Sequence, residues 1–259
     1  IGLDKSSVIT TDQLAQAVPG IDVIIDGHSH TAIENGLVVG GTLIAQTGYH
    51  EHNLGRVDIT VKDHKIINKH SRLYTEQELK MLVPEPDPVI ANEISRMVQK
   101  NKALFDQVVT TSPVTLTGDR EYVRAHETEL GNLATDAIRW ATKADIAMIN
   151  GGNIRADLKK GTVTKGDIMR IFPFGSTVVT IHVSGADLQA ALEQSVGAYP
   201  VLYGGFLQVS GISFSFDPAQ PKGHRVSAIL VGGQPLDTAW TYVVAVNDFL
   251  AKGGDGYTM

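Results

Sequence analysis

The chain contains no cysteine among its 259 residues. Disulfide bonds, thiolate nucleophiles and cysteine-based metal sites are therefore excluded. It also has no signal-like start and no apolar run of the length that a membrane-spanning helix requires. The 22 basic residues are outnumbered by 28 acidic residues, which gives a formal net charge of −6. We therefore expect no nucleic acid polymer as a partner, because binding a phosphate backbone requires basic surface.

The residues that are present describe a chain with a substantial core. Hydrophobic residues make up 42% of the sequence and charged residues 19%, which excludes wholesale disorder. The length suits one large domain or two of ordinary size. A small phosphorylated ligand stays possible, because it needs only a few well-placed arginines. The first residue is Ile1 and the end is polar, so we expect the sequence to be part of a longer protein.

Local patterns predict the elements of the chain. Strands and helices are intermixed without a regular βαβ rhythm, which favours a mixed α/β (α+β) fold. The strand at 64–74 is expected to pair with the two strands before it. A polar, proline-rich linker is expected at 74–88. Helices are predicted at 10–18, 89–107, 128–144, 164–172 and 185–196, and strands at 21–26, 41–48, 54–61, 64–74, 108–116, 144–150, 176–185, 206–217, 225–233 and 241–250.

Two histidines follow the first strand, in the segment "DVIIDGHSHT". Imidazole is a common ligand of zinc and manganese, and loops at strand ends are where α/β scaffolds carry their sites. The alternative is that His28 and His30 are exposed turn residues, which is the usual state of a His-x-His pair. The remaining histidines are scattered and are predicted to lie on the surface.

Arginines and glycines in residues 107–259 could form a site for an anion. Arg120 and Arg124 are four residues apart and would share a helical face. Two guanidinium groups suit a phosphate, although pairing with Glu121 and Glu127 on a solvated face is the more common arrangement. A buried strand then ends in "NGGNIR", where glycines allow close backbone approach and Arg155 follows. The same turn could be a simple connection.

Aromatic residues beside glycine occur in "IFPFGST" and "NDFLAKGGDGY". Core packing is the ordinary fate of phenylalanine. The functional alternative is that one ring from each loop stacks on a planar base. Asp255, on its glycine-rich loop, could accept hydrogen bonds from a ribose diol.

These segments together resemble the 5′-nucleotidase family. "GIDVIIDGHSHT" followed by "TLIAQTGYHEHNLGRVDITV" resembles the last part of its metallophosphoesterase domain. "GDREYVR", "NGGNIR", "PFGS", "YGGFLQVSGISFSFD" and "NDFLAKGGDGY" follow the order of its C-terminal domain. Asn153 departs from the third glycine that family members often carry in this turn. The resemblance implies a truncated metallophosphoesterase β-sandwich domain at 1–73, a linker and helix at 74–106, and a mixed α/β substrate-binding domain at 107–259.

The resemblance also implies roles for individual residues. His28 and His30 would be two ligands of a centre of two divalent metal ions, zinc or manganese, whose other ligands precede Ile1. Phosphate would be held by Arg120, Arg124 and Arg155, the base by Asn150, Phe174 and Phe249, and the ribose by Gly204 and Asp255.

A nucleoside 5′-monophosphate is the substrate that the resemblance implies for the intact protein, at an extracellular, cell-surface or periplasmic location. Residues 1–259 alone would bind a nucleotide or nucleoside without hydrolysing it. Three alternatives stay open. They are a 2′,3′-cyclic nucleotide phosphodiesterase or UDP-sugar or NAD pyrophosphatase, a non-catalytic nucleoside-binding module, and a structural surface protein.

Overall fold

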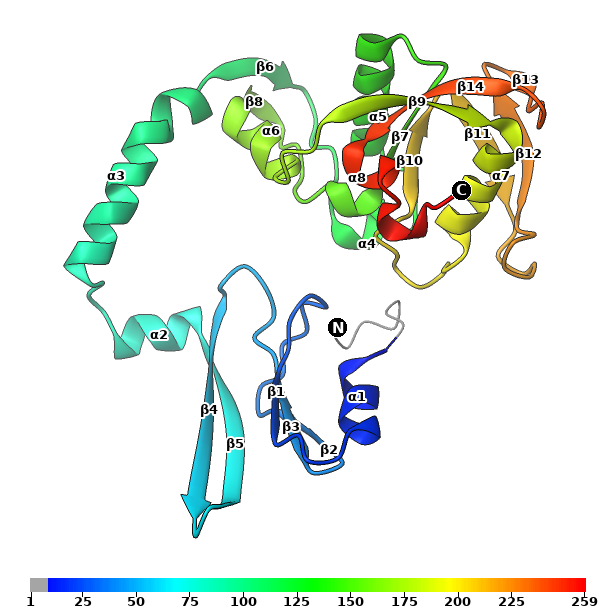
Figure 1. Cartoon of the computed structure of the whole chain (residues 1–259). Helices are drawn as coiled ribbons and strands as arrows, with labels where there is room; N and C mark the ends of the chain where they lie inside the picture. Colours follow the sequence, from blue (N-terminus) through cyan, green and yellow to red (C-terminus); the bar gives the residue numbers. More distant parts are fainter. Residues whose placement is uncertain (1–8) are drawn as a thin grey trace. The chain divides into compact units, whose positions relative to one another are not determined.

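The computed structural model describes residues 9–259 (Figure 1). Contacts within the chain divide it into two compact units, Ile1–Arg96 and Met97–Met259. The division falls inside helix α3, Pro88–Phe105. No described helix is long and apolar enough to cross a membrane.

The first unit contains a small sheet of three strands in the order β1-β3-β2. Its middle strand β3, Thr42–Ala45, is buried along its whole length, and helix α1, Thr11–Ala17, contacts it. Strand β1, Val23–Ile25, pairs with β3 in parallel, and β2, Leu37–Val39, pairs with it antiparallel. The predicted pairing of 41–48 with 64–74 is therefore wrong. The hydrogen bonds of β3 go to β1 and to β2, a strand that the sequence analysis missed.

A long two-stranded ribbon completes this unit. Strand β4, Asn53–Lys62, pairs antiparallel with β5, Lys65–Thr75, as expected for the strands at 54–61 and 64–74. The turn between them contains Asp63 and His64, both with positive φ.

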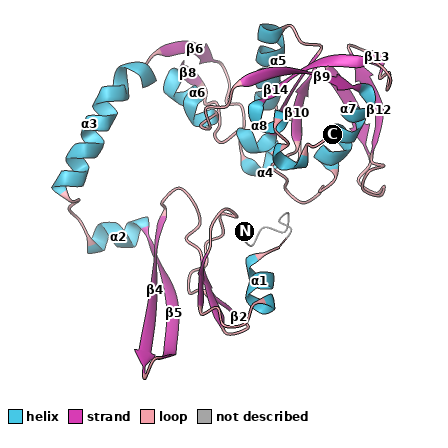
Figure 2. Cartoon of the chain, in the orientation of Figure 1, coloured by secondary structure: helices cyan, strands magenta, loops and turns pink. Residues whose placement is uncertain are grey.

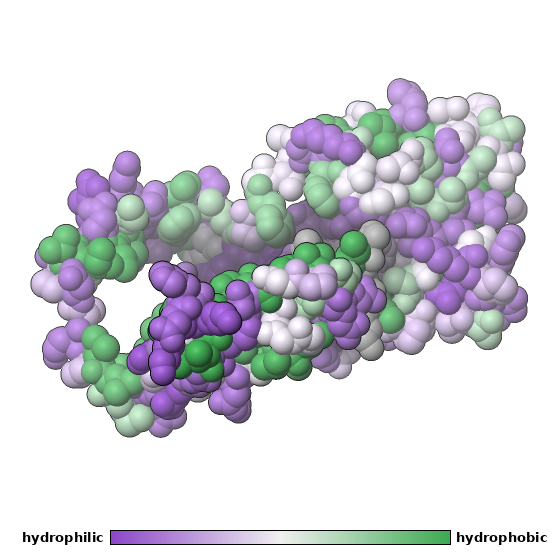
Figure 3. Space-filling model, turned by 60° about the horizontal axis from the view of Figure 1, so that its bottom comes forward, coloured by the Kyte–Doolittle hydropathy of each residue, from purple (hydrophilic) through white to green (hydrophobic). Residues whose placement is uncertain are grey.

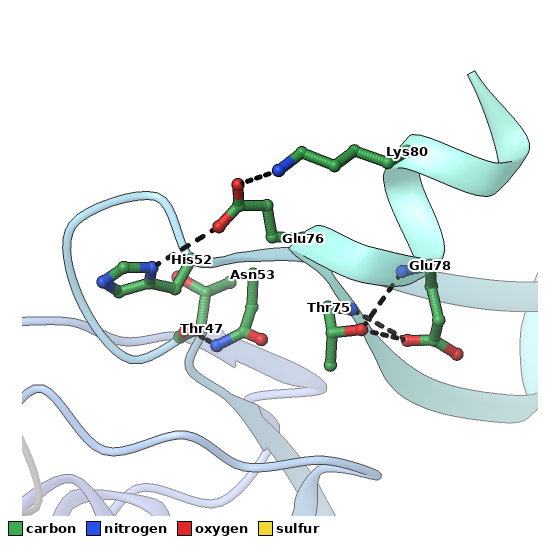
Figure 4. A network of polar contacts seen from close by, with 7 residues as sticks. All are labelled: Thr47, His52, Asn53, Thr75, Glu76, Glu78 and Lys80. Carbon is green, nitrogen blue, oxygen red and sulfur yellow. Dashed lines mark hydrogen bonds and ion pairs between the residues drawn. The ribbon is translucent and has the colours of Figure 1, made fainter. Parts of the chain in front are cut away.

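Helix α2, Glu76–Leu82, lies within the polar, proline-rich segment 74–88 that is predicted to be a linker. Thr75 caps this helix: its Oγ1 accepts a hydrogen bond from the Glu78 backbone N–H at 3.3 Å, and the Glu78 carboxylate accepts one from the Thr75 backbone N–H at 2.8 Å (Figure 4). Lys80 also donates to Glu76 one turn earlier, at 2.6 Å. The capping box Thr-x-x-Glu was the sequence signal for a helix start, and the prolines that follow mark only its end.

Helix α3 has the amphipathic pattern predicted for 89–107, yet none of its residues is buried. Val89, Ile90 and Ile94 all expose more than half of their surface. Figure 3 shows hydrophobic surface at the left of the view, where Figure 1 places α2 and α3.

The second unit is built on a four-stranded mixed sheet in the order β10-β7-β14-β9. Figure 2 draws the strands of this unit in magenta. Strand β14 runs parallel to β7, whereas β10 and β9 run antiparallel to their neighbours. The mixed α/β class predicted from the sequence is confirmed. The strands are β7, Ile146–Asn150, β9, Val178–Ser184, β10, Leu207–Ser210, and β14, Thr241–Asn247.

Both faces of this sheet are covered, which explains why β7 is a continuous apolar run. Ile146 and Met148 belong to the cluster that contains Leu188 and Leu192 of helix α7, Gly185–Val196. Their neighbour Ile149 packs on the other side with Leu130 of helix α5, Glu129–Thr142. The alternation follows from the two-residue period of a strand.

Smaller elements surround the main sheet. Strand β6, Val108–Ser112, pairs with β8, Gly161–Thr164, and a three-stranded sheet has the order β11-β12-β13. The predicted strand 241–250 is too long, because its last residues begin helix α8. The other elements are α4, Arg120–Val123, η1, Gly151–Asn153, α6, Lys165–Ile171, β11, Ile212–Phe216, β12, Val226–Val231, β13, Gln234–Pro235, α8, Asp248–Ala251, and η2, Gly254–Gly256.

Candidate functional site

Four loops leave the same edge of the main sheet. Strands β7 and β14 are parallel and end at Asn150 and Asn247. Strand β9 begins at Val178, opposite Asn247, and β10 begins at Leu207, opposite Asn150. The segments 151–155, 172–177, 203–206 and 248–257 therefore start or finish at one edge. We call these four segments the loop cluster.

The glycine turn after β7 is held against the segment before β10. The Gly151 N–H donates to the Phe206 carbonyl at 2.7 Å, and the Gly152 N–H donates to the Gly204 carbonyl at 2.7 Å. A Cβ on Gly151 would lie 2.0 Å from the Val123 carbonyl oxygen, so no other residue fits there. The turn is thus a packed junction in which glycine is needed for close backbone approach.

Three arginines border this junction. A Cβ on Gly204 would lie 3.8 Å from Nη1 of Arg124, and Arg155 donates from Nη1 to the Gly152 carbonyl at 3.4 Å. Burial lowers the pKa of Arg155, and the positive charge of Arg120 lowers it further. The guanidinium groups of Arg120 and Arg155 are therefore close enough to repel one another. An anion placed beside them would offset this repulsion.

The carboxylate of Asp255 lies near Gly204, on which Arg124 also borders. A Cβ on Gly204 would be 3.8 Å from Asp255 Oδ2 as well as from Arg124 Nη1. Asp255 has the left-handed conformation, with φ 51°, which non-glycine residues seldom adopt. Tyr203 donates from its hydroxyl to the Asp255 carbonyl, and Gln194 donates to the same oxygen at 3.2 Å. The backbone of Asp255 is thus held by two side chains.

Phe174 and Phe249 both reach the surface, and Phe172 packs against the core instead. The exposed fractions are 60% for Phe174 and 46% for Phe249. Their loops are joined directly, because the Asp248 N–H donates to the Thr177 carbonyl at 2.9 Å. The Arg155 guanidinium lies 5.5 Å from the centre of the Phe174 ring, and so the residues expected to hold phosphate and base are adjacent.

His28 and His30 lie in the first unit, in a loop where both have positive φ, 65° and 60°. The buried side chain of Gln46 holds this loop, since its Oε1 accepts from the Thr31 N–H at 2.7 Å and from Ser29 Oγ at 3.0 Å. His30 stacks on Tyr49, with ring centres 5.3 Å apart, and lies 6.2 Å from the ring of His50.

The two histidines do not complete a metal site with other side chains of the described residues. Within residues 9–259 no group of three or more His, Asp or Glu side chains could hold a metal ion. Two imidazoles are half of the donor set that a four-coordinate ion uses.

Sequence reasoning missed the residues that support the site. Tyr203, Asn247 and Gln208 lie within the quoted segments, but no role was assigned to them. Tyr203 bonds to Asp255, Asn247 bonds to Asn150, and Gln208 bonds to the segment that contains Arg124. Asn247 precedes the short helix α8 and its side chain caps it, which was the one available signal.

Comparison with known proteins gives the context for this geometry. Residues 108–259 match the family model "5'-nucleotidase, C-terminal domain". The chain is 33% identical, over 95% of its length, to the trifunctional nucleotide phosphoesterase protein YfkN of Bacillus subtilis, of which it covers 18%. It is 30% identical, over its whole length, to the snake venom 5′-nucleotidase of Naja atra, of which it covers 56%.

The fold agrees with these likenesses. The 5′-nucleotidase precursor of Thermus thermophilus superposes with a TM-score of 0.76 at 34% identity, over 93% of this chain and 52% of that one. The chain thus spans about half the length or less of these relatives. Since the family model covers more than half of the chain, the chain belongs to the 5′-nucleotidase family and carries its C-terminal domain at residues 108–259.

Proposed function

We propose that the loop cluster binds a nucleoside 5′-monophosphate, and that the intact protein hydrolyses it to nucleoside and phosphate. The position of Gly204 supports this best. A cationic group of Arg124 and the carboxylate of Asp255 both lie 3.8 Å from the place where its Cβ would be. One small ligand that carries a phosphate next to a sugar can therefore reach both, and the missing side chain leaves room for the sugar.

In this proposal, separate residues bind the phosphate, the ribose and the base of the ligand. Arg124 and Arg155, with Arg120, hold the phosphate through charge-assisted hydrogen bonds. Asp255 accepts hydrogen bonds from the ribose hydroxyls. Phe174 and Phe249 stack on the base, which suits their exposure. Asn150, at the end of β7, lies near the base in this proposal, and its amide bonds to Asn247 and Asp255.

Hydrolysis belongs to the longer protein in this proposal. Residues 1–73 are the end of a metallophosphoesterase domain, 74–106 a linker and helix, and 107–259 the substrate-binding domain. His28 and His30 would contribute two ligands to a centre of two zinc or manganese ions. Such ions supply polarisation of the phosphoryl group and activation of water. We place the intact protein outside the cell or at its surface, and the similarity to a venom 5′-nucleotidase supports this location.

Calorimetry with AMP and adenosine tests the phosphate assignment. Replacing one of two arginines that share a desolvated anion costs roughly 2–5 kcal/mol. Arg155→Ala should therefore weaken AMP binding by that amount and leave adenosine binding nearly unchanged. Arg170→Ala is the matched control, because Arg170 is exposed and pairs with Asp167, at 3.3 Å. Unchanged affinity of Arg155→Ala for both ligands would remove Arg155 from the phosphate site.

Activity of the intact protein separates the enzymatic alternatives. The relative YfkN is named a trifunctional nucleotide phosphoesterase, so more than one class of nucleotide ester should be compared as a substrate. Faster turnover of a 2′,3′-cyclic nucleotide or of NAD than of any nucleoside monophosphate would contradict the proposed substrate.

A further inference from the structure

Three hydrogen bonds connect the start of helix α8 to the carboxylate of Asp255. The Leu250 backbone N–H donates to Asn247 Oδ1 at 2.9 Å. Asn247 Nδ2 donates to Asn150 Oδ1 at 2.9 Å, and Asn150 Nδ2 donates to Asp255 Oδ2 at 2.8 Å. Asn247 is 4% exposed and Asn150 is 5% exposed. We call this series of bonds the amide relay.

The direction of the relay is set by the backbone. A backbone N–H can only donate, so the atom of Asn247 that faces Leu250 must be its oxygen. The amide nitrogen of Asn247 then faces Asn150 and requires an oxygen there. Asn150 in turn presents its nitrogen to Asp255, whose ionised carboxylate can only accept. A single arrangement satisfies every member, and burial makes a reversed amide costly.

The relay ends on a residue whose backbone is also held. Tyr203 and Gln194 bind the carbonyl of Asp255, and the relay binds its carboxylate. The left-handed conformation of Asp255 persists only when the surroundings determine it. Backbone and side chain are therefore oriented before a ligand arrives, which reduces the entropy lost on binding.

We propose that Asn247 is a positioning residue that, through Asn150, orients the Asp255 carboxylate to select ligands with a hydrogen-bond-donating diol. Asn247 itself touches no ligand in this proposal, since its amide is buried and both of its polar atoms face the relay. The inference rests on the proposed nucleotide site, and it adds the residue that determines its preference for ribose.

The substitution Asn247→Asp separates the relay from helix capping. Aspartate keeps the oxygen that accepts from the Leu250 N–H and is a good N-cap residue. It lacks the nitrogen that donates to Asn150, so the Asn150 amide should turn and direct its oxygen at Asp255. Asn247→Ser is the second variant, because it also caps the helix and buries no charge. Asn101→Asp, at an exposed position of α3, repeats the change in net charge as a control.

Binding of adenosine and of 2′,3′-dideoxyadenosine to the full chain gives the decisive comparison. We expect both Asn247 variants to bind adenosine about tenfold more weakly, because a hydrogen bond to a charged group is misdirected. Dideoxyadenosine, which has no diol, should bind with unchanged affinity. In the Asp255→Ala background, Asn247→Ser should have no further effect on adenosine. Side-chain amide resonances of Asn150 should shift in the Asn247 variants without any ligand.

Two results would overturn the proposal. Equal losses for adenosine and dideoxyadenosine would show that Asn247 acts only on the general stability of the site. No loss for adenosine in Asn247→Ser, with a normal melting temperature, would show that the relay does not orient Asp255. If the unmodified chain binds neither adenosine nor AMP, the proposed function itself fails, and this outcome differs from the other two.

Discussion

Two glycines of the loop cluster have different roles. Gly151 allows close packing of the backbone, and Gly204 leaves space for a ligand. A Cβ on Gly151 would meet the Val123 carbonyl oxygen at 2.0 Å, a contact that the fold cannot accommodate. A Cβ on Gly204 meets no atom closer than 3.8 Å, which is ordinary van der Waals contact. The first glycine is thus required by packing, and the second is open to the site.

Gly204→Ala should lower ligand affinity while the fold remains intact. The added methyl group would lie between Arg124 and Asp255, where we place the sugar. We expect AMP binding to weaken by roughly 1–3 kcal/mol, the usual cost of overpacking, and the melting temperature to change little. Calorimetry and thermal denaturation measure the two effects. Gly151→Ala is the comparison, and it should lower the melting temperature strongly. Full AMP affinity in Gly204→Ala would place the sugar elsewhere.

At the scale of elements, one buried side chain fixes the connection between α4 and α5. Gln208 on β10 is 1% exposed. Its Oε1 accepts from the Thr128 N–H at 3.0 Å, and its Nε2 donates to the carbonyls of Val123 and His126 at 3.1 and 2.7 Å. Arg124 lies within the segment that these bonds hold. The position of an arginine of the site therefore depends on a strand far along the chain.

Gln208→Leu should destabilise the protein by about 2–5 kcal/mol. The substitution keeps a similar volume but removes the partners of the buried Thr128 N–H, the buried Val123 carbonyl and the partly buried His126 carbonyl. Each unpaired buried group costs about 1–3 kcal/mol, and local rearrangement relieves part of this cost. Chemical denaturation measures the change. AMP affinity should fall in the same variant, because the Arg124 segment loses its anchor. Gln220→Leu on an exposed turn serves as the control. A stability close to that of the unmodified chain would contradict this account.

At the scale of the whole molecule, the chain consists of two compact units that differ in their cores. The main clusters of buried apolar residues lie within Met97–Met259, whereas the described part of the first unit buries only a few apolar side chains, chiefly on β3. Helix α3, which spans the division, contributes no buried residue to either unit. The site residues that we assign to the nucleotide all lie in the second unit.

Residues 97–259 alone should therefore fold and bind nucleosides. Their three core clusters and the amide relay are all internal to this segment. We expect a cooperative thermal transition and an adenosine affinity within about 0.5 kcal/mol of that of the full chain, as for independent sites. Circular dichroism and calorimetry check both. A segment that is unfolded, or folded but unable to bind adenosine, would show that the first unit is needed.

Much of the local structure could be predicted from the sequence. Helix α5 and strand β7 follow from their apolar periods, and the arginines, glycines and aromatics of the loop cluster stand in recognisable motifs. These features depend on residues that are close in sequence, so helix and strand propensities and the spacing of apolar residues predict them. Helix α2 has a capping box that predicts its start, but the prolines that follow it are equally typical of an irregular linker.

Tertiary structure decided what those residues do together. Asn247 and Asn150 are 97 positions apart, and Asn150 and Asp255 are 105 apart, so no local pattern predicts that one amide orients the next. The insertion of β14 between β7 and β9 brings their ends to one edge. The order of amino acids already specifies which chemical groups the site has. Only the sheet order decided that they meet, since contacts between distant segments depend on the packing of the whole unit.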